Sequence, residues 1–469
     1  MGEVDVSALL AEFGEVGLGD ARLDERLMRI AALIAASPGK SFPDQMETEA
    51  DQEALYRFLA NDKVSLEKIL AGHQRETRAR ISGRRCVRVL HDTSEFAFEG
   101  QREGLGILKG KVKGFLAHVA LAVSADEERE PLGVVGVHPF VNADVLKHRG
   151  LTKSQRARAS FVKKREDKKS SRWEKLALAT SAALPEGTRA IHIMDQEADD
   201  YVIFDALTTA SVGFVIRGSD SRFLHGRRRI SDVLAEQVVH TFRDVTLSPR
   251  PEKKDKKQHP ERAERLATLK VCWSDVTLVR PPHNNAAALE IALNVVHVFE
   301  PDPPAGATAI AWTLFTSEPV SSLEDATAVV DHYRARWMIE EYFKALKTGC
   351  AFEKRQLCSL DALKRAFGLF VPMAWKLLSI RHLGRAVTSP PAAALLDDNQ
   401  LHLLQAMLEK RSRSLPTAPS VRDVMLGIAA LGGHIKNNGD PGWMVLGRGF
   451  RRFIEAEEGW NLARRSDQS

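Results

Sequence analysis

The chain has 469 residues, of which 44% are hydrophobic and 28% are charged, a composition typical of a folded protein of about three domains. No apolar run approaches the roughly 20 residues of a membrane helix, and acids occupy the N-terminal positions where a signal peptide carries bases. We therefore expect a cytoplasmic protein without a membrane partner. The 67 basic and 62 acidic residues give a net charge of +5, which permits a nucleic-acid partner without requiring one.

The charge is unevenly divided along the chain. Residues 147–175 contain twelve Lys or Arg against three Asp or Glu, and residues 250–270 contain eight against four. The first 70 residues have the opposite charge balance, with seven basic and fourteen acidic residues. One basic run is usually a solvated loop or helix face, but several in one chain indicate a polyanionic partner.

The N-terminal part has the apolar spacing of helices, interrupted by Ser-Pro-Gly at 37–39, which predicts a helical domain over residues 1–70. Short apolar runs bounded by Gly or Pro then predict strands, and residues 173–184 predict a helix between them. Such a mixture of strands and helices favours an α/β core. The predicted strands cover residues 87–90, 115–123, 132–137, 190–194 and 212–217.

The pattern changes at residue 219. Residues 219–311 combine charged loops with alternating segments, which predicts a β-rich module inserted into the core. From residue 322 onward the apolar spacing is helical. We therefore expect a core over residues 71–370, containing the insertion, and a helical C-terminal domain over residues 371–469.

Two of the predicted strands end in an acid. The run VRVLH leads to Asp92, and the run AIHIM leads to Asp195. Acids at the carboxyl ends of adjacent strands lie at the sheet edge where open α/β sheets place their sites. Either aspartate taken alone is equally typical of a turn-capping residue.

A third acid lies in the predicted helix YRARWMIEEYFKALK, residues 333–347. At about 100° per residue, one stripe of this helix carries a carboxylate, three bases and a phenol, and Trp337 and Phe343 face the core. An ordinary surface helix with ion pairs between residues four apart has the same pattern. The residues of the stripe are Tyr333, Arg336, Glu340, Lys344 and Lys347.

Three carboxylates from two strand ends and a helix suit a magnesium site. Mg²⁺ prefers oxygen ligands, and it usually takes one or two carboxylates together with phosphate oxygens and water. Two such ions can activate a water or a 3′-hydroxyl and stabilise the leaving oxygen during phosphodiester cleavage. The candidate metal ligands for this chemistry are Asp92, Asp195 and Glu340.

The three acids lie in the motifs HDTSEF, MDQEADDY and YRARWMIEEYFKALKTG. In the last motif an Arg follows the Tyr after two intervening residues, a Glu follows after three more, and a Lys follows after another six. This signature comes after the two aspartate motifs in the chain. In these motifs the chain resembles bacterial DDE cut-and-paste transposases of the insertion-sequence-four group, closest to the transposon-five type. The resemblance covers nearly the whole chain, including LGDARLDERL, SPGKS and QEALYRFLAND near the N-terminus and GIAALGGHIKNNGDPGW near the C-terminus.

The resemblance implies a ribonuclease H-like core in which Asp92, Asp195 and Glu340 bind two Mg²⁺ ions, with Mn²⁺ as a substitute. Trp312 matches the aromatic residue on which a flipped base stacks, although a core strand tryptophan is the alternative. Arg217 matches a basic residue near the active site, or forms a strand-end salt bridge. The residues matched to DNA-backbone contacts are Tyr333, Arg336, Lys344, Lys347, Arg22, Arg26, Lys40 and Arg57. In the acidic N-terminal region Asp24, Glu25 and Glu53 could instead pair with these bases.

A transposase of this family is expected to bind inverted terminal repeats as a homodimer and to nick each end. The free 3′-hydroxyl then forms a hairpin, which is opened before the end is joined to target DNA. Such an enzyme works on nucleoid DNA in the bacterial cytoplasm. Two alternatives stay open: a ribonuclease H-like nuclease without strand transfer, and a catalytically inactive DNA-binding regulator or remnant.

Overall fold

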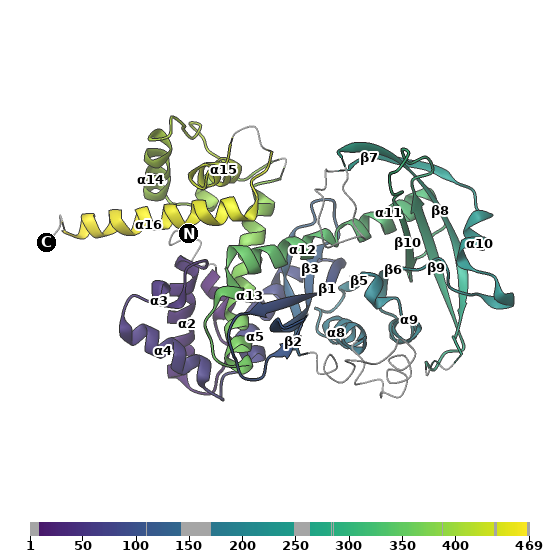
Figure 1. Ribbon diagram of the computed structural model, residues 1–469, viewed down its shortest axis with the longest axis horizontal. Helices are drawn as coiled ribbons and strands as arrows, with labels where there is room; N and C mark the ends of the chain where they lie inside the picture. Colours follow the sequence, from purple (N-terminus) through teal and green to yellow (C-terminus); the bar gives the residue numbers. More distant parts are fainter. Residues whose placement is uncertain are drawn as a thin grey trace. The chain divides into compact units, whose positions relative to one another are not determined.

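The computed structural model describes residues 9–108, 110–141, 170–247, 263–282, 284, 286–386, 388–435 and 439–466. These residues form two compact units, whose helices and strands are labelled in Figure 1. The first unit draws on the ranges 1–82, 93–159 and 338–469, and the second on 83–92 and 160–337. No helix in the described ranges is both long enough and apolar enough to cross a membrane.

The N-terminal part of the first unit is helical, as the apolar spacing predicts. Most of its helices begin at a polar residue whose side chain accepts a backbone N–H, as Asp20 does for the second helix and Ser65 for the last. Ser37 ends the second helix at the predicted Ser-Pro-Gly break. The elements are η1 (Ala11–Phe13), α2 (Ala21–Ala36), α3 (Phe42–Gln45), α4 (Glu49–Ala60) and α5 (Leu66–Ile81).

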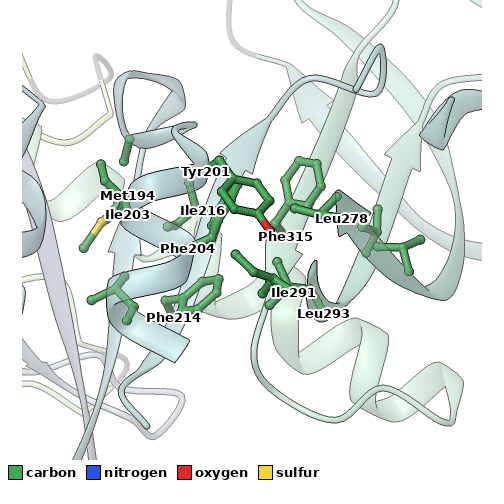
Figure 2. Packing of buried hydrophobic residues seen from close by; sticks show 14 of the residues in the cluster. Met194, Tyr201, Ile203, Phe204, Phe214, Ile216, Leu278, Ile291, Leu293 and Phe315 are labelled. Atoms are coloured by element: carbon green, nitrogen blue, oxygen red, sulfur yellow. The ribbon is translucent and has the colours of Figure 1, made fainter. Parts of the chain in front are cut away.

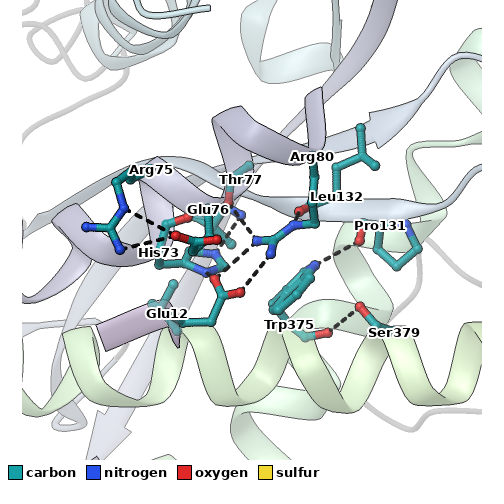
Figure 3. A network of polar contacts seen from close by, with 12 residues as sticks. Glu12, His73, Arg75, Glu76, Thr77, Arg80, Pro131, Leu132, Trp375 and Ser379 are labelled. Atoms are coloured by element: carbon teal, nitrogen blue, oxygen red, sulfur yellow. Dashed lines mark hydrogen bonds and ion pairs between the residues drawn. The ribbon is translucent and has the colours of Figure 1, made fainter. Parts of the chain in front are cut away.

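A buried polar network joins η1 and α5 to a strand of the same unit (Figure 3). Glu12, 2% exposed, accepts from His73 at 2.5 Å and from Arg80 at 2.7 and 3.1 Å. The Val134 N–H donates to His73 Nε2 at 2.9 Å, so the imidazole proton lies on Nδ1 and points at Glu12. Arg80 also lies 4.1 Å over the Trp375 ring. The charged groups named here are therefore hydrogen-bonded, with Glu12 and His73 buried and Arg80 partly buried.

The strands of the first unit pair with a central strand, β3, whose residues are almost all buried. β2 and β4 pair antiparallel with β3, and the end of β1 is its other neighbour. Phe96 on β1 packs against Phe115 on β3 and Phe367 on the long helix α13. The elements are the end of β1 (Cys86–Phe98), β2 (Gly106–Ile107), β3 (Lys113–Ser124) and β4 (Pro131–Phe140).

The rest of the first unit is helical, in agreement with the pattern from residue 322 onward. Leu404, Val424, Ile428 and Phe453 share one buried apolar cluster. The elements are α12 (Trp337–Lys344), a π-helical turn η5 (Ala345–Gly349), η6 (Phe352–Lys354), α13 (Leu360–Leu383), η7 (Ala392–Ala394), α14 (Asp398–Glu409), α15 (Val421–Leu431) and α16 (Trp443–Ser466). The expected domain boundaries at 70 and 370 fall inside α5 and α13, and the three expected ranges stay a prediction.

The second unit contains a mixed sheet in the order β1-β5-β6-β10-β9-β8-β7. β1, β5 and β6 are parallel, and the strands from β10 onward are antiparallel. The last three strands of this order come from the segment predicted to be a β-rich insertion. The elements are β5 (Arg189–Met194), β6 (Gly213–Gly218), β7 (His240–Leu247), β8 (Arg265–Val279), β9 (Glu290–Phe299) and β10 (Ala311–Thr316).

Helices of the second unit pack against this sheet around a core that Figure 2 shows from close by. Phe204 from one helix stacks on Phe214 of β6 and packs at a tilt against Phe315 of β10. The elements are α8 (Ser171–Ala182), η3 (Gln196–Ala198), α9 (Tyr201–Thr209), η4 (His225–Arg227), α10 (Ile230–Ala235) and α11 (Leu323–Arg334). The expected α/β fold, with a mixed sheet, a β-rich insertion and helical ends, is therefore confirmed.

Candidate active site at Asp92 and Asp195

The two predicted aspartates lie side by side where β1 and β5 stop pairing. The parallel pairing runs from Cys86 opposite Arg189 to Leu90 opposite Ile193, and each aspartate follows two residues later. Because paired strands lie about 4.8 Å apart, their carboxylates are at the same level of the sheet. One expectation is corrected: β1 does not end at Asp92 but continues to Phe98.

Buried histidines lie directly behind these carboxylates. His91 Nε2 lies 2.7 Å from His192 Nδ1, and His192 Nε2 lies 2.7 Å from the Ser181 hydroxyl. Burial lowers the pKa of His192 to about 3, so this ring is neutral near pH 7. The bonded rings join β1 to β5 next to both acids. Histidines inside apolar strands were the sequence signal for this pair, and sequence reasoning passed over them.

Each aspartate keeps carboxylate oxygen near the surface. Asp195 accepts the Glu197 N–H with Oδ1 at 2.9 Å, and within the described ranges Oδ2 makes no hydrogen bond. Asp92 has 21% of its side chain exposed, and its Oδ2 lies 3.5 Å from Arg336 Nη1. The Asp92 carboxylate thus already has positive charge beside it, as it would in a metal site.

The predicted phenol and bases of the second unit gather at the same place. Tyr333 is 5% exposed, and burial raises the pKa of its phenol although the nearby Arg336 and Arg217 favour the ionised form. The ring of Trp312 meets the Tyr333 ring edge-on, with centroids 5.6 Å apart. The structure therefore brings together Asp92, Asp195, Arg217, Trp312, Tyr333 and Arg336.

Arg172, at the start of α8, joins this group and was not singled out from the sequence. Its guanidinium pairs with Glu197 at 2.5 Å, and Asp195 and Asp92 are close enough to raise its pKa against the larger effect of burial, which lowers it. It belongs to the basic stretch 147–175, one of the runs that indicate a polyanionic partner. Residues 147–169 of that stretch lie outside the described residues.

The predicted helix 333–347 is not one helix, and this corrects the stripe. α11 ends at Arg334, α12 begins at Trp337, and the π-helical turn η5 follows from Ala345. A constant 100° per residue therefore does not hold across the signature. Trp337, expected to face the core, is 59% exposed, whereas Phe343 is buried as expected.

Glu340, Lys344 and Lys347 belong to the first unit. Glu340 is half-buried on α12, and its neighbour Glu341 accepts from Arg381 at 2.6 Å and pairs with Lys344 at 2.7 Å. Lys347 donates to the Glu95 carbonyl, and burial lowers its pKa. Both lysines are thus anchored within the protein, and their contact with DNA stays a prediction.

The predicted N-terminal contacts lie on or between helices of the first unit. Arg22 and Arg26 lie on α2, and Lys40 lies in the loop before α3. Arg57 on α4 pairs with Glu53 at 2.5 Å, which is the alternative left open for this region.

No group of three or more His, Cys, Asp or Glu side chains in the described ranges is arranged to hold a metal ion. Asp92 and Asp195 nevertheless offer the oxygen donors that a hard divalent cation prefers, at one level of the sheet. The metal site therefore stays a prediction, with two of its three acids already adjacent.

Two regions of the chain match known protein families. Residues 6–64 match a transposase DNA-binding domain, and residues 174–371 match a transposase DDE domain. Asp195 and Glu340 lie inside the second match, and Asp92 lies before it. The chain is also similar to a solved structure of the piggyBac transposase in a synaptic complex with hairpin DNA, at 10% identity and a TM-score of 0.41. That match covers 88% of this chain and 82% of the other.

Proposed function

The chain belongs to the DDE transposases, and on this premise we propose that it cuts the ends of a mobile DNA element and joins them to target DNA. The adjacent pair of Asp92 and Asp195, surrounded by Arg217, Tyr333 and Arg336, is the observation that carries this proposal. Carboxylates for metal binding and arginines for phosphate binding are the two requirements of phosphodiester chemistry.

Asp92, Asp195 and Glu340 would hold two Mg²⁺ ions, and Mn²⁺ would substitute. A bound metal pair supplies an activated water or 3′-hydroxyl and stabilises the leaving oxygen. Lewis-acid chemistry of this kind needs carboxylates that are ionised and accessible, and Asp92 retains 21% exposure of its side chain.

The neighbouring side chains would bind and orient the DNA. The planar guanidinium of Arg336 can hold a phosphate with two parallel bonds, and Arg217 can do the same from β6. Tyr333 stays protonated near pH 7 because burial raises its pKa, so its hydroxyl can donate a hydrogen bond. Trp312 would stack on a base turned out of the duplex.

The finer mechanism follows the insertion-sequence-four group that the signature resembles. We propose that a homodimer pairs two inverted repeats, that residues 6–64 bind them, and that each nicked end passes through a hairpin before strand transfer. The enzyme would act on nucleoid DNA in the bacterial cytoplasm.

Selection from a randomised 30-base-pair library by the immobilised full-length protein would supply a cognate duplex for the test. With Mg²⁺ we expect nicking of this selected duplex, and with a target plasmid we expect joined products. Glu340→Gln should bind the duplex but not nick it. Nicking by Glu340→Gln at the wild-type rate would refute the proposed mechanism, and nicking without joined products would identify a plain nuclease.

A second candidate function is a regulator that occupies DNA ends without cutting them. The match of residues 6–64 to a transposase DNA-binding domain is sufficient for such a role. Tight binding of the selected duplex, with no nicking in Mg²⁺ or Mn²⁺, would establish this alternative.

A further inference from the structure

Arg355 is a buried arginine that no predicted role accounts for. It follows η6 and is 2% exposed. Its guanidinium donates to three backbone carbonyls, those of Lys40, Pro38 at 2.7 Å and Cys350 at 2.6 Å. The rings of Phe42 and Phe370 lie 5.0 and 4.5 Å away. One side chain therefore connects the loop after α2 to the end of the π-helical turn η5.

This arrangement needs an arginine. Burial lowers the pKa of Arg355 to about 10, so the group is still charged at pH 7, and its hydrogen bonds go to carbonyl dipoles. A buried charge is costly unless it is hydrogen-bonded, and the Nε of Arg355 has no partner within the described ranges. Lysine keeps the charge but lacks the planar fork that reaches several acceptors at once.

A second contact joins the same two segments. A Cβ added at Gly39 would lie 3.0 Å from the Gly349 carbonyl oxygen, so the loop and the turn touch backbone to backbone. On another side the loop borders a small apolar pocket, which Trp443 and Phe450 also line. Hydrogen bonds are further anchors of the loop.

Some of these anchors lie close to the loop in the sequence. Gln45 donates to the Ser37 carbonyl at 2.8 Å, and the Lys40 N–H closes a turn onto the same carbonyl at 3.0 Å. These bonds stay within the region matched to the DNA-binding domain. The bonds of Arg355 leave that region and reach the turn that continues α12, the helix of Glu340.

We propose that Arg355 is a positioning residue that transmits occupation of the Ser37–Lys40 loop by a DNA backbone to α12. Loop and turn share one guanidinium and one backbone contact, so movement of the loop carries the turn and the helix with it. The inference rests on the proposed function, because it needs DNA at the loop and Glu340 at the chemistry.

Arg365 provides a matched control. It is half-buried and also donates to carbonyls of the N-terminal region, those of Leu59 at 2.9 Å and Val64 at 2.8 Å, and it pairs with Asp62. It is located on α13, and none of its hydrogen-bond partners lies in α12 or η5. Arg365→Lys thus weakens attachment of the N-terminal region without touching the link to Glu340.

The test compares nicking of the library-selected duplex with nicking of a scrambled duplex, both at saturating concentration and with the full-length protein. Wild type should nick the selected duplex at least about tenfold faster, as expected for an ordinary coupling between two sites. Arg355→Lys should remove this preference while binding the selected duplex with unchanged affinity. Arg365→Lys should keep the preference.

Hydrogen exchange gives a readout that does not depend on cleavage. The selected duplex should slow amide exchange at residues 345–349 in wild type and in Arg365→Lys, but not in Arg355→Lys. If wild type binds but never nicks, the proposed function fails and this exchange pattern alone decides whether the link exists.

Two outcomes would overturn the inference. Arg355→Lys could slow nicking of both duplexes equally, which marks an ordinary structural residue, or it could keep both the preference and the protection. If Arg355→Lys does not fold, Gly39→Ala disturbs the same junction without removing a charge. It should reduce the preference and the protection, and wild-type behaviour of Gly39→Ala would then contradict the proposal.

Discussion

A carboxylate faces an arginine in two regions of this protein, and the two places are built differently. Glu12 is 2% exposed and is held by His73 and Arg80 at 2.5 to 3.1 Å (Figure 3). Asp92 keeps 21% of its side chain exposed and lies 3.5 Å from Arg336. Both acids have a cation beside them, but only Glu12 is enclosed.

This difference in enclosure distinguishes an acid that stabilises the fold from an acid of the candidate active site. The His73 and Arg80 bonds lower the pKa of Glu12 although burial alone would raise it, so the protein itself stabilises the carboxylate. At Asp92 the pair with Arg336 is longer, part of the side chain stays exposed, and the neighbouring Asp195 adds a second negative charge that a bound cation would offset. Removal of Glu12 should therefore cost folding free energy, and removal of Asp92 should cost activity.

The largest effect is expected from Asp92→Asn. Loss of one metal-binding carboxylate removes several kcal/mol of transition-state stabilisation, so nicking of the selected duplex should fall on the order of a thousandfold. Thermal unfolding should be unchanged or shifted upward, because one of two adjacent negative charges is lost. An equally large loss of stability would show that Asp92 is structural, like Glu12.

The next largest effect is expected from Glu12→Ala. Removing one partner of a buried ion pair costs about 3 kcal/mol, and here the partly buried Arg80 and the buried His73 both lose their acceptor. Urea unfolding should show this loss, whereas nicking per folded molecule should be preserved. Glu53→Ala is the control: its pair with Arg57 is exposed, so the change should stay within about 1 kcal/mol.

Trp312→Ala tests whether the aromatic wall of the site serves DNA or packing. Base stacking on an aromatic side chain is worth about 1–3 kcal/mol, so hairpin formation from a nicked end should fall roughly tenfold. Trp273, stacked on His240 in the β-rich insertion, is the matched control, and Trp273→Ala should leave hairpin yield unchanged. Equal losses for both variants would assign Trp312 to packing.

The smallest effect concerns pH and the buried histidines. Burial lowers the pKa of His73 in the folded state below its ordinary value of 6.5, so the unfolded chain binds a proton first as the pH falls. The free energy of unfolding should decrease below pH 6.5 by up to about 1.4 kcal/mol per pH unit from this group. At higher pH its contribution is fully present.

Midpoints of urea unfolding measured between pH 7.5 and 5.5 would check how the free energy of unfolding changes with pH. His73→Gln should flatten this dependence, and His402→Gln, at an exposed position, should leave it unchanged. Identical slopes for wild type and His73→Gln would contradict the assigned role of burial.

The sequence by itself determined the order and spacing of Asp92, Asp195 and Glu340, the α/β core and the helical ends. Local apolar periodicity and turn residues carry that information. It also located Arg217, Trp312, Tyr333 and Arg336, which the structure gathers beside the two aspartates.

Only the tertiary structure decided the rest. β1 continues past Asp92 because its later residues find a second neighbour in β3, and the signature helix breaks after Arg334 into α11 and α12. Arg355 connects residues more than 300 positions apart, to Lys40 and Pro38. Such contacts depend on burial and on partners distant along the chain. The local spacing of apolar and polar residues therefore does not predict them.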